Sequence, residues 1–288
     1  MKSTPRQIGS SGILVQPIGL GGMPLSIAGR PDEAQAFATI KAFVDGGGDF
    51  IDTANVYCLD DADLGHNERL IAGALRRLGK TAAVTVAAKG GLRRPRGAWL
   101  TDGHPQWLRA SCEKSLKDLG VETISLYQLH AIDSKVGLAD SLGELIRLKQ
   151  EGKISHIGLS NISPADLEQA LAMTPIVSVQ NRCNVLEQRD FKYGLVRMCA
   201  DKGVAFIPHS PVGGHQGHAR LRGNGTITAL AQKHGASVYQ IALAWFLHKG
   251  EHIIPIPGAS KPASVMGSLG AAGIQLTAEE VEAMDRLA

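Results

Sequence analysis

The sequence has no uninterrupted run of about 18 apolar residues, the length that a membrane-spanning helix requires. Residues 1–19 carry charges but lack the continuous apolar stretch of a secretory signal peptide. The four cysteines are far apart and form no C-x-x-C pair. These absences predict a soluble, cytoplasmic protein with reduced thiols, in which Cys58 is a small half-buried filler rather than a reactive group.

A large excess of charge of one sign is also missing. Thirty Lys and Arg residues stand against 27 Asp and Glu residues, for a formal net charge of +3. Because this net charge is small and the charged residues are evenly spread along the chain, we do not expect nucleic acid or anionic membranes as partners. With 44% hydrophobic residues the chain can bury a large core. We therefore expect a globular protein with a small-molecule partner and no obligate protein partner.

Short apolar or β-branched runs alternate with amphipathic stretches along the whole chain. The eight predicted strands are Ile18–Gly21, Phe50–Thr53, Val84–Lys89, Ile124–His130, His156–Ser160, Ile176–Gln180, Val204–Pro208 and Ile253–Ile256. Helices are predicted over Asp32–Asp45, Pro105–Leu119 and Leu138–Glu151, and another begins at Ser163. Eight βα units predict one (β/α)₈ TIM barrel domain over residues 1–288.

Two further elements are predicted at the ends of the chain. Ile8–Val15 is typical of a β-hairpin, and Thr277–Glu280 is a capping box that opens a C-terminal helix. Two glycine-rich segments do not support a nucleotide-binding loop. Gly46–Gly48 lies where a helix must end and turn, and Gly19–Gly22 has Pro24 in place of the third glycine of a dinucleotide fingerprint.

Polar residues gather at the C-terminal ends of the predicted strands, the face that carries the active site of such barrels. They are Asp52, Tyr57, Lys89, His130, Ser160, Asn161, Gln180 and Ser210. A buried lysine requires a partner, and Asp52 on the adjacent strand is the expected one for Lys89. A cation beside Tyr57 predicts a lowered phenol pKa and a proton donor. His130 taken alone fits a core histidine better than a catalytic one, but together these residues predict a catalytic site.

Motifs in a fixed order carry a resemblance to the aldo-keto reductase family over nearly the whole chain. They are Phe50-Ile51-Asp52-Thr53-Ala54 with Tyr57, Gly65 with Asn67-Glu68, Ala88-Lys89, Leu129-His130, Gly158-Leu159-Ser160-Asn161, Val179-Gln180-Asn181, Ser210-Pro211 and Ile256-Pro257-Gly258-Ala259-Ser260. The layout resembles that of bacterial members with short loops. Gly213-Gly214 is similar to a feature of pyridoxal reductases.

The resemblance implies reversible hydride transfer between a nicotinamide cofactor and a carbonyl substrate, without a metal. It makes Tyr57 the general acid, Lys89 and Asp52 the groups that lower its pKa, and His130 the residue that orients the carbonyl. NADPH is the favoured cofactor and NADH the alternative. The implied cofactor-binding residues are Ser160, Asn161, Gln180, His209, Ser210, Pro211, Gly258, Ser260 and Lys261. The implied substrate pocket includes Met23, Trp99 and Ala131.

The sequence departs from its relatives at several positions. His209 stands where many have an aromatic residue that stacks on the nicotinamide, so the charge of this ring is expected to depend on pH. Ser264, Gly267 and Ser268 replace an Arg and a Glu-Asn pair, so the adenine contacts are expected to differ. Ala131 replaces a bulky aromatic residue, which predicts a wide pocket.

Two segments near the predicted site have simpler interpretations than a direct role in the reaction. Arg93–Arg96 is predicted to be a solvated basic loop, although with Trp99 it could meet an anionic or aromatic substrate. Asn67 and Glu68 are predicted to be a helix cap and a first-turn acid.

Three other functions stay open at this point. His209, His215 and His218 could indicate a metal-dependent hydrolase, although the last two lie in a glycine-rich stretch. Lys89 could form a Schiff base in an aldolase, although a paired lysine stays protonated and is a poor nucleophile. A redox sensor that binds the nicotinamide cofactor with little turnover is the third alternative.

Overall fold

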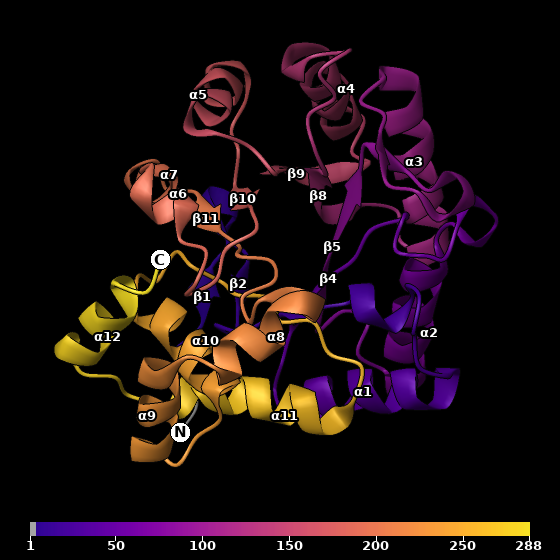
Figure 1. Ribbon diagram of the computed structural model, residues 1–288. Coiled ribbons are helices and arrows are strands. Elements are labelled where there is room, and N and C mark those ends of the chain that lie inside the picture. Colours follow the sequence, from indigo (N-terminus) through magenta and orange to yellow (C-terminus); the bar gives the residue numbers. More distant parts are fainter. Residues whose placement is uncertain (1–3) are drawn as a thin grey trace.

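The computed structural model describes residues 4–288, apart from the side chains of His215 and Gln216. Seven parallel strands form one sheet in the order β11-β10-β9-β8-β5-β4-β3. Helices surround these strands as a ring (Figure 1). Each of the first seven predicted strands overlaps one observed strand: β3 Leu20–Gly21, β4 Phe50–Asp52, β5 Thr85–Gly90, β8 Ile124–Leu129, β9 Ile154–Ser160, β10 Ser178–Gln180 and β11 Ala205–Phe206.

The last predicted strand closes the barrel although it is not a regular strand. The amide of Ile254 donates to the carbonyl of Phe206 in β11 (2.9 Å), and the amide of Gly19 donates to the carbonyl of Pro255 (3.0 Å). The segment therefore bonds to both edges of the sheet. Pro255 and Pro257 have no N–H group, which interrupts the ladder that a regular strand would form. The predicted (β/α)₈ barrel is confirmed.

The helices follow the strands as the alternation predicted. Their bounds are α1 Glu33–Asp45, α2 His66–Leu78, α3 Pro105–Leu119, α4 Leu138–Gln150, α5 Pro164–Met173, α6 Arg189–Lys192, α7 Leu195–Asp201, α8 Gly214–Arg222, α9 Gly225–Lys233, α10 Val238–His248, α11 Pro262–Gly270 and α12 Ala278–Asp285. Among residues 4–288, no helix combines the length and apolar character that crossing a bilayer requires.

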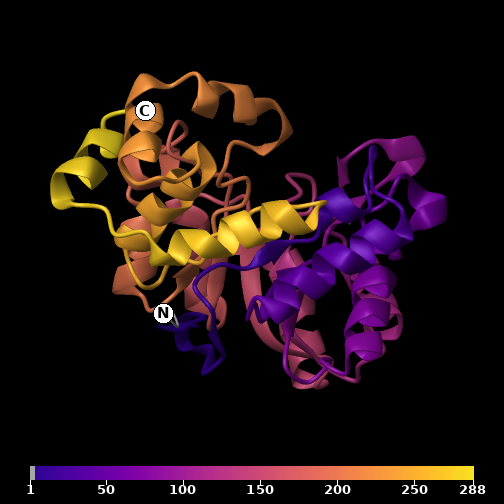
Figure 2. The ribbon, with the colours of Figure 1, turned by 90° about the horizontal axis from the view of Figure 1, so that it is seen from below.

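Side-chain caps define several helix starts. Asp32 accepts a hydrogen bond from the amide of Gln35 at the start of α1, and Ser163 and Thr277 form capping boxes at α5 and α12. Helix α1 ends at the predicted glycine turn, in which Gly47 has a φ of 90°. In both views α1 and α11 lie side by side (Figure 2).

The predicted N-terminal hairpin is confirmed, with its first strand slightly earlier than expected. Strand β1 (Arg6–Gln7) pairs with β2 (Leu14–Val15) across a 3₁₀ turn. Ile8 and Val15 pack with buried side chains from the starts of the barrel strands. Gly9 has a φ of 51°, and a Cβ there would lie 2.2 Å from the carbonyl oxygen of Val177. Only glycine permits this close approach, so the hairpin seals the N-terminal end of the barrel.

Side chains alternate in character along the barrel interior. Apolar residues lie toward the N-terminal ends of three neighbouring strands, and polar residues follow two positions later on the same face. The pairs are Phe50 and Asp52, Ala87 and Lys89, and Leu126 and Gln128. The interior is therefore a packed apolar layer that supports a polar layer at the C-terminal ends of the strands.

Candidate active site

Lys89 is the centre of the polar layer. Its ammonium donates to Asp52 Oδ2 (2.5 Å), to the carbonyl of Thr53 (3.0 Å) and to the phenol oxygen of Tyr57 (2.8 Å). Lys89 and Asp52 are buried, and an ammonium group has three N–H donors, so all three are used. The strand-to-strand pairing of Lys89 with Asp52 predicted from the sequence is confirmed.

Asp52 is held by two glutamines on its other oxygen. Gln180 Nε2 donates to Asp52 Oδ1 at 2.7 Å, and Gln128 Nε2 donates to the same atom at 3.2 Å. Gln128 was not among the predicted site residues. The period of two along Ile124–His130, which puts Gln128 and His130 on one face, was the signal that pointed to it.

The predicted lowering of the Tyr57 pKa is wrong for the protein without cofactor or substrate. Burial, and next the charge of Asp52, raise the pKa of Tyr57 well above its usual value. The reason is that the charge of Lys89 is already neutralised by Asp52, so the phenol is not beside a free cation. Burial also lowers the pKa of Lys89, and Asp52 opposes that effect. Tyr57 therefore keeps its proton at neutral pH.

His130 lies beside Tyr57 at the end of β8. The two rings meet edge to face with centroids 5.7 Å apart. His130 is buried, and its Nδ1 has no hydrogen-bond partner among the described residues. Burial, with the charge of Lys89 and the neighbouring His209, lowers the pKa of His130 well below its usual value. A neutral imidazole therefore stands next to the phenol.

The segments after β9 and β11 meet over His130. Asn161 Nδ2 donates to the carbonyl of His130 (2.9 Å) and to Ser160 Oγ (3.0 Å). His209 Nε2 lies 3.4 Å from Asn161 Oδ1. Asn161 and Ser210 have φ values of 57° and 54°, a left-handed backbone that is uncommon for residues other than glycine. Such strain concentrates at functional sites.

His209 is uncharged at neutral pH. Burial, with the positive charges of Lys89 and Arg182, lowers its pKa to about 4, although Glu187 opposes this. The pH dependence expected of this ring therefore lies in the acidic range. Its planar face therefore carries no charge at neutral pH.

The other predicted cofactor residues end or follow barrel strands on the C-terminal side, at the open end that we call the mouth. None of them shares a hydrogen bond with Lys89 among the described residues. Gln180 and Pro211 are buried, Ser260 is half-buried, and Gly258 and Lys261 are exposed. Lys261 directly precedes α11 and caps it without a side-chain hydrogen bond. A Cβ at Gly258 would lie 2.7 Å from Pro24, so the chain passes closely there.

The predicted substrate residues lie at the rim, and one prediction about it is wrong. Trp99 is 46% exposed and meets Tyr57 edge to face at 6.5 Å, and Met23 is 36% exposed. Ala131 is half-buried directly after His130. Arg94 was expected in a solvated loop but is buried, because its guanidinium bonds to three backbone carbonyls. The carbonyls of Cys58 and Leu59 are far from Arg94 in the sequence, so no pattern in the neighbouring residues could predict this contact.

The prediction that Asn67 caps a helix is also wrong. Gly65 is the N-cap of α2, and the buried amide of Asn67 donates to the carbonyl of Gly22 (2.8 Å) and to Ser26 Oγ (2.8 Å). Asn67 therefore connects α2 to the segment that follows β3. Glu68 is a first-turn acid as expected, and its burial raises its pKa to about 7.

Cys58 is a filler as predicted, but its side chain is fully buried rather than half-buried. Burial raises the pKa of the thiol to about 11. The thiol is therefore protonated and unreactive at neutral pH.

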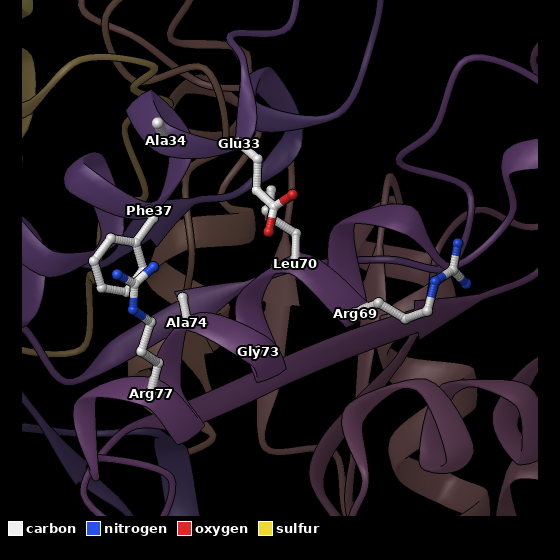
Figure 3. Close-up of a pocket in the computed structure, with 8 residues that line it drawn as sticks. All are labelled: Glu33, Ala34, Phe37, Arg69, Leu70, Gly73, Ala74 and Arg77. Carbon is white, nitrogen blue, oxygen red and sulfur yellow. The ribbon is translucent and has the colours of Figure 1, made fainter.

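A separate surface groove of about 440 Å³ lies between α1 and α2. Figure 3 shows Arg77 lying over the ring of Phe37, with its guanidinium carbon 4.1 Å from the ring centroid. The groove is lined by Glu33, Ala34, Phe37, Arg69, Leu70, Gly73, Ala74 and Arg77. None of the predicted site residues lines it, so it is not part of the mouth.

Metal-ligating side chains do not converge at the mouth in the part of the chain that the structure describes. The one group of three that converges among the described residues is Asp102, His104 and Asp133, and it includes none of the predicted site residues. His218, which suggested a hydrolase, packs its ring against Tyr239 at 5.1 Å. The ion pair with Asp52 gives no support to a Schiff base on Lys89.

Comparisons with known proteins agree with this geometry. Residues 17–288 match the model of the aldo/keto reductase family. The chain is 33% identical to a probable aldo-keto reductase of Glycine max, over 96% of this chain and 86% of that protein. It resembles a crystal structure of a thermostable aldo-keto reductase with the inhibitor epalrestat, with a TM-score of 0.85, 26% identity and 99% of each chain covered. An aldo-keto reductase of Klebsiella pneumoniae in complex with NADPH has a TM-score of 0.81 and 25% identity, with 100% of this chain and 95% of that chain covered.

Proposed function

Because the chain belongs to the aldo/keto reductase family, we propose that it reduces an aldehyde or ketone to an alcohol with NADPH, and that Tyr57 supplies the proton. The observation that carries this proposal is the hydrogen bond that Lys89 donates to the phenol oxygen of Tyr57. Since an ammonium group can only donate, the hydroxyl proton of Tyr57 is not used in that bond. It is available to a carbonyl oxygen at the mouth.

The residues around Tyr57 fit a nicotinamide cofactor. Gln180 uses its amide nitrogen on Asp52, which leaves its carbonyl oxygen to accept from a carboxamide N–H group. Ser160 and Asn161 add polar atoms beside it. The neutral, planar ring of His209 suits a stacked nicotinamide. NADPH supplies hydride when bound, and a related enzyme of Klebsiella pneumoniae is described in complex with it.

The pyrophosphate and adenosine end of the cofactor requires a different part of the mouth. Ser210, Pro211, Gly258, Ser260 and Lys261 are the residues that would hold it. Lys261 places an exposed ammonium at the N-terminus of α11, and both this cation and the positive end of the helix dipole favour phosphate.

The proton is released by Tyr57 as negative charge develops on the carbonyl oxygen. The raised pKa of Tyr57 keeps the donor protonated until then. Once the proton has left, the hydrogen bond from Lys89 stabilises the phenolate. His130 lies beside the phenol as a neutral imidazole. Its N–H group can donate a hydrogen bond to the carbonyl oxygen of the substrate, as Tyr57 does. Two donors then converge where charge appears, which lowers the barrier.

The direct test is Tyr57→Phe, which removes the proton donor and keeps the ring. We expect carbonyl reduction to fall by about 100-fold or more, the usual contribution of a general acid. Quenching of tryptophan fluorescence by NADPH should be nearly unchanged, because the phenol is not needed to hold the cofactor. Turnover should be measured with pyridoxal and with nitrobenzaldehyde.

A titration with NADH in the same experiment gives the cofactor preference. Turnover that survives the Tyr57→Phe change would contradict the proposed role of Tyr57. Tight binding of NADPH by the unmodified protein without turnover of any aldehyde would support a redox sensor instead.

A further inference from the structure

Arg94 is a buried cation whose position suggests more than packing. Its Nη1 donates to the carbonyl of Gly97 (2.5 Å), and its Nη2 donates to the carbonyls of Cys58 (3.1 Å) and Leu59 (3.2 Å). No carboxylate of the described residues forms an ion pair with it, and its Nε atom has no partner there. Removing a guanidinium from water lowers the stability of the folded protein unless other interactions offset the loss. The hydrogen bonds of Arg94 connect its own turn to the loop that contains Cys58 and Leu59.

The two connected loops both belong to the active-site mouth. Cys58 and Leu59 directly follow Tyr57, whereas Gly97 lies in the turn between the short strands β6 (Leu92–Arg93) and β7 (Leu100–Thr101). The loops touch: a Cβ at Gly97 would lie 3.2 Å from the carbonyl oxygen of Leu59. In the same turn Arg96 has a φ of 49°, which is strained for a residue with a side chain.

The guanidinium of Arg94 also supports Trp99. Its central carbon lies 3.8 Å from the centroid of the indole. With one face covered in this way, Trp99 is still 46% exposed, and its ring meets Tyr57 at an interplanar angle of 74°. Tyr57 in turn meets His130 at 81°. Flat aromatic surfaces therefore stand around the phenol, and Leu59 beside them is 41% exposed.

We propose that Arg94 is a positioning residue that holds Trp99 against the mouth, and that the surface so formed recognises the aromatic ring of an aryl aldehyde or ketone. This inference rests on the proposed reductase function. A planar guanidinium can reach three carbonyls and stack on an indole at once, which a lysine cannot do. An aromatic ring in the substrate would pack on the exposed part of Trp99, whereas a short aliphatic aldehyde would not reach it.

The experiment compares two substrates in three proteins. The kcat and KM for 4-nitrobenzaldehyde and for propanal are measured with NADPH in the unmodified protein, Arg94→Lys and Arg94→Met. We expect the KM for 4-nitrobenzaldehyde to rise about three- to tenfold in both variants, while kcat for both substrates and the KM for propanal change less than twofold. A merely structural role would change both substrates together, and that result would overturn the proposal.

Arg93 provides the matched control on the same hairpin. It also stacks on a tryptophan, with its guanidinium carbon 4.0 Å from the Trp107 ring, and it pairs with Asp102. Among the described residues, its side chain forms no hydrogen bond or ion pair with the loop after Tyr57. Arg93→Met should therefore leave the ratio of the two KM values unchanged. An equal shift in this control would show that any disturbance of the hairpin has the same effect, which would contradict a specific role for Arg94.

Two further measurements separate the inference from the proposed reductase function. In a Trp99→Ala background, Arg94→Lys should have no additional effect on the aryl KM, because the surface it supports is gone. Amide hydrogen exchange in segments 58–64 and 95–101 should become faster in Arg94→Lys and stay unchanged in Arg93→Met. If the unmodified protein reduces neither aldehyde, the reductase proposal fails. Independently of that result, unchanged hydrogen exchange of both segments in Arg94→Lys would overturn the role of Arg94.

Discussion

The two ends of the same barrel strands differ within a distance of two residues. At the N-terminal end, Phe50, Ala87 and Leu126 pack against the hairpin that seals the barrel. At the C-terminal end, Asp52 and Lys89 are equally buried but charged. The first layer stabilises the fold by removing apolar surface from water, whereas the second costs stability that only its hydrogen bonds offset. The molecule therefore maintains a costly polar layer on an apolar support.

The largest effect should follow from breaking the polar layer. Lys89→Met leaves Asp52 as an unpaired buried charge and removes the donor to Tyr57, so we expect about 3–5 kcal/mol lower stability and about 100-fold or more lower kcat. Urea unfolding and steady-state kinetics measure the two effects.

The double variant Lys89→Met with Asp52→Asn is the control for this change. Removing both charges should recover most of the free energy of unfolding without restoring the reaction. Recovery of activity in the double variant would show that the ion pair serves the fold alone.

The apolar layer should respond in the opposite way. Phe50→Ala removes a fully buried ring and should lower the free energy of unfolding by about 3–5 kcal/mol. The activity of the folded fraction, measured well below the unfolding midpoint, should change little because Phe50 packs in the apolar cluster of the hairpin, whereas Tyr57 belongs to a separate cluster. A large loss of kcat in fully folded protein would mean that the two layers are not separable. Phe50→Leu, with a smaller volume change, should give a smaller loss of stability.

The smallest effect should be the pH dependence that His209 introduces at the polar end. Its pKa of about 4 lies below the usual value near 6.5, so between these values the unfolded chain binds a proton that the folded chain does not. Stability should therefore fall as the pH decreases through this range. We expect the free energy of unfolding to fall by about 1–3 kcal/mol less in His209→Phe than in the unmodified protein over this pH range.

Urea unfolding at pH 7 and at pH 4.5 checks this prediction. The fall that remains in His209→Phe belongs to other groups, such as His130, whose pKa is also lowered by burial. Identical pH profiles for the two proteins would mean that His209 accepts a proton freely in the folded state.

Much of the architecture could be predicted because its signals are local. The capping residues Asp32, Ser163 and Thr277 start their helices as expected. The alternation in Phe50–Asp52 and Ile124–His130 placed polar side chains at strand ends on one face. Such signals act between neighbours in the chain, so they are visible without coordinates.

The failed predictions concern contacts between distant segments. Asn67 looked like a cap because of its place before a helix, but its partners, Gly22 and Ser26, lie more than 40 residues away. Arg94 looked solvated in a run of basic residues, yet it bonds to carbonyls of Cys58 and Leu59. No local pattern records which backbone carbonyls will meet a side chain.

The sequence by itself determined the alternation of strands and helices, the apolar and polar ends of the strands, and the residue types at the mouth. Only the tertiary structure decided how their charges combine. Tyr57 lies beside a lysine, but its pKa is raised because burial excludes water and because the negative charge of Asp52 is close to the phenol. The sequence specifies which residue types are present. The pKa of each group depends on its distance from other charges and on its solvent exposure, and both are defined only in the folded protein.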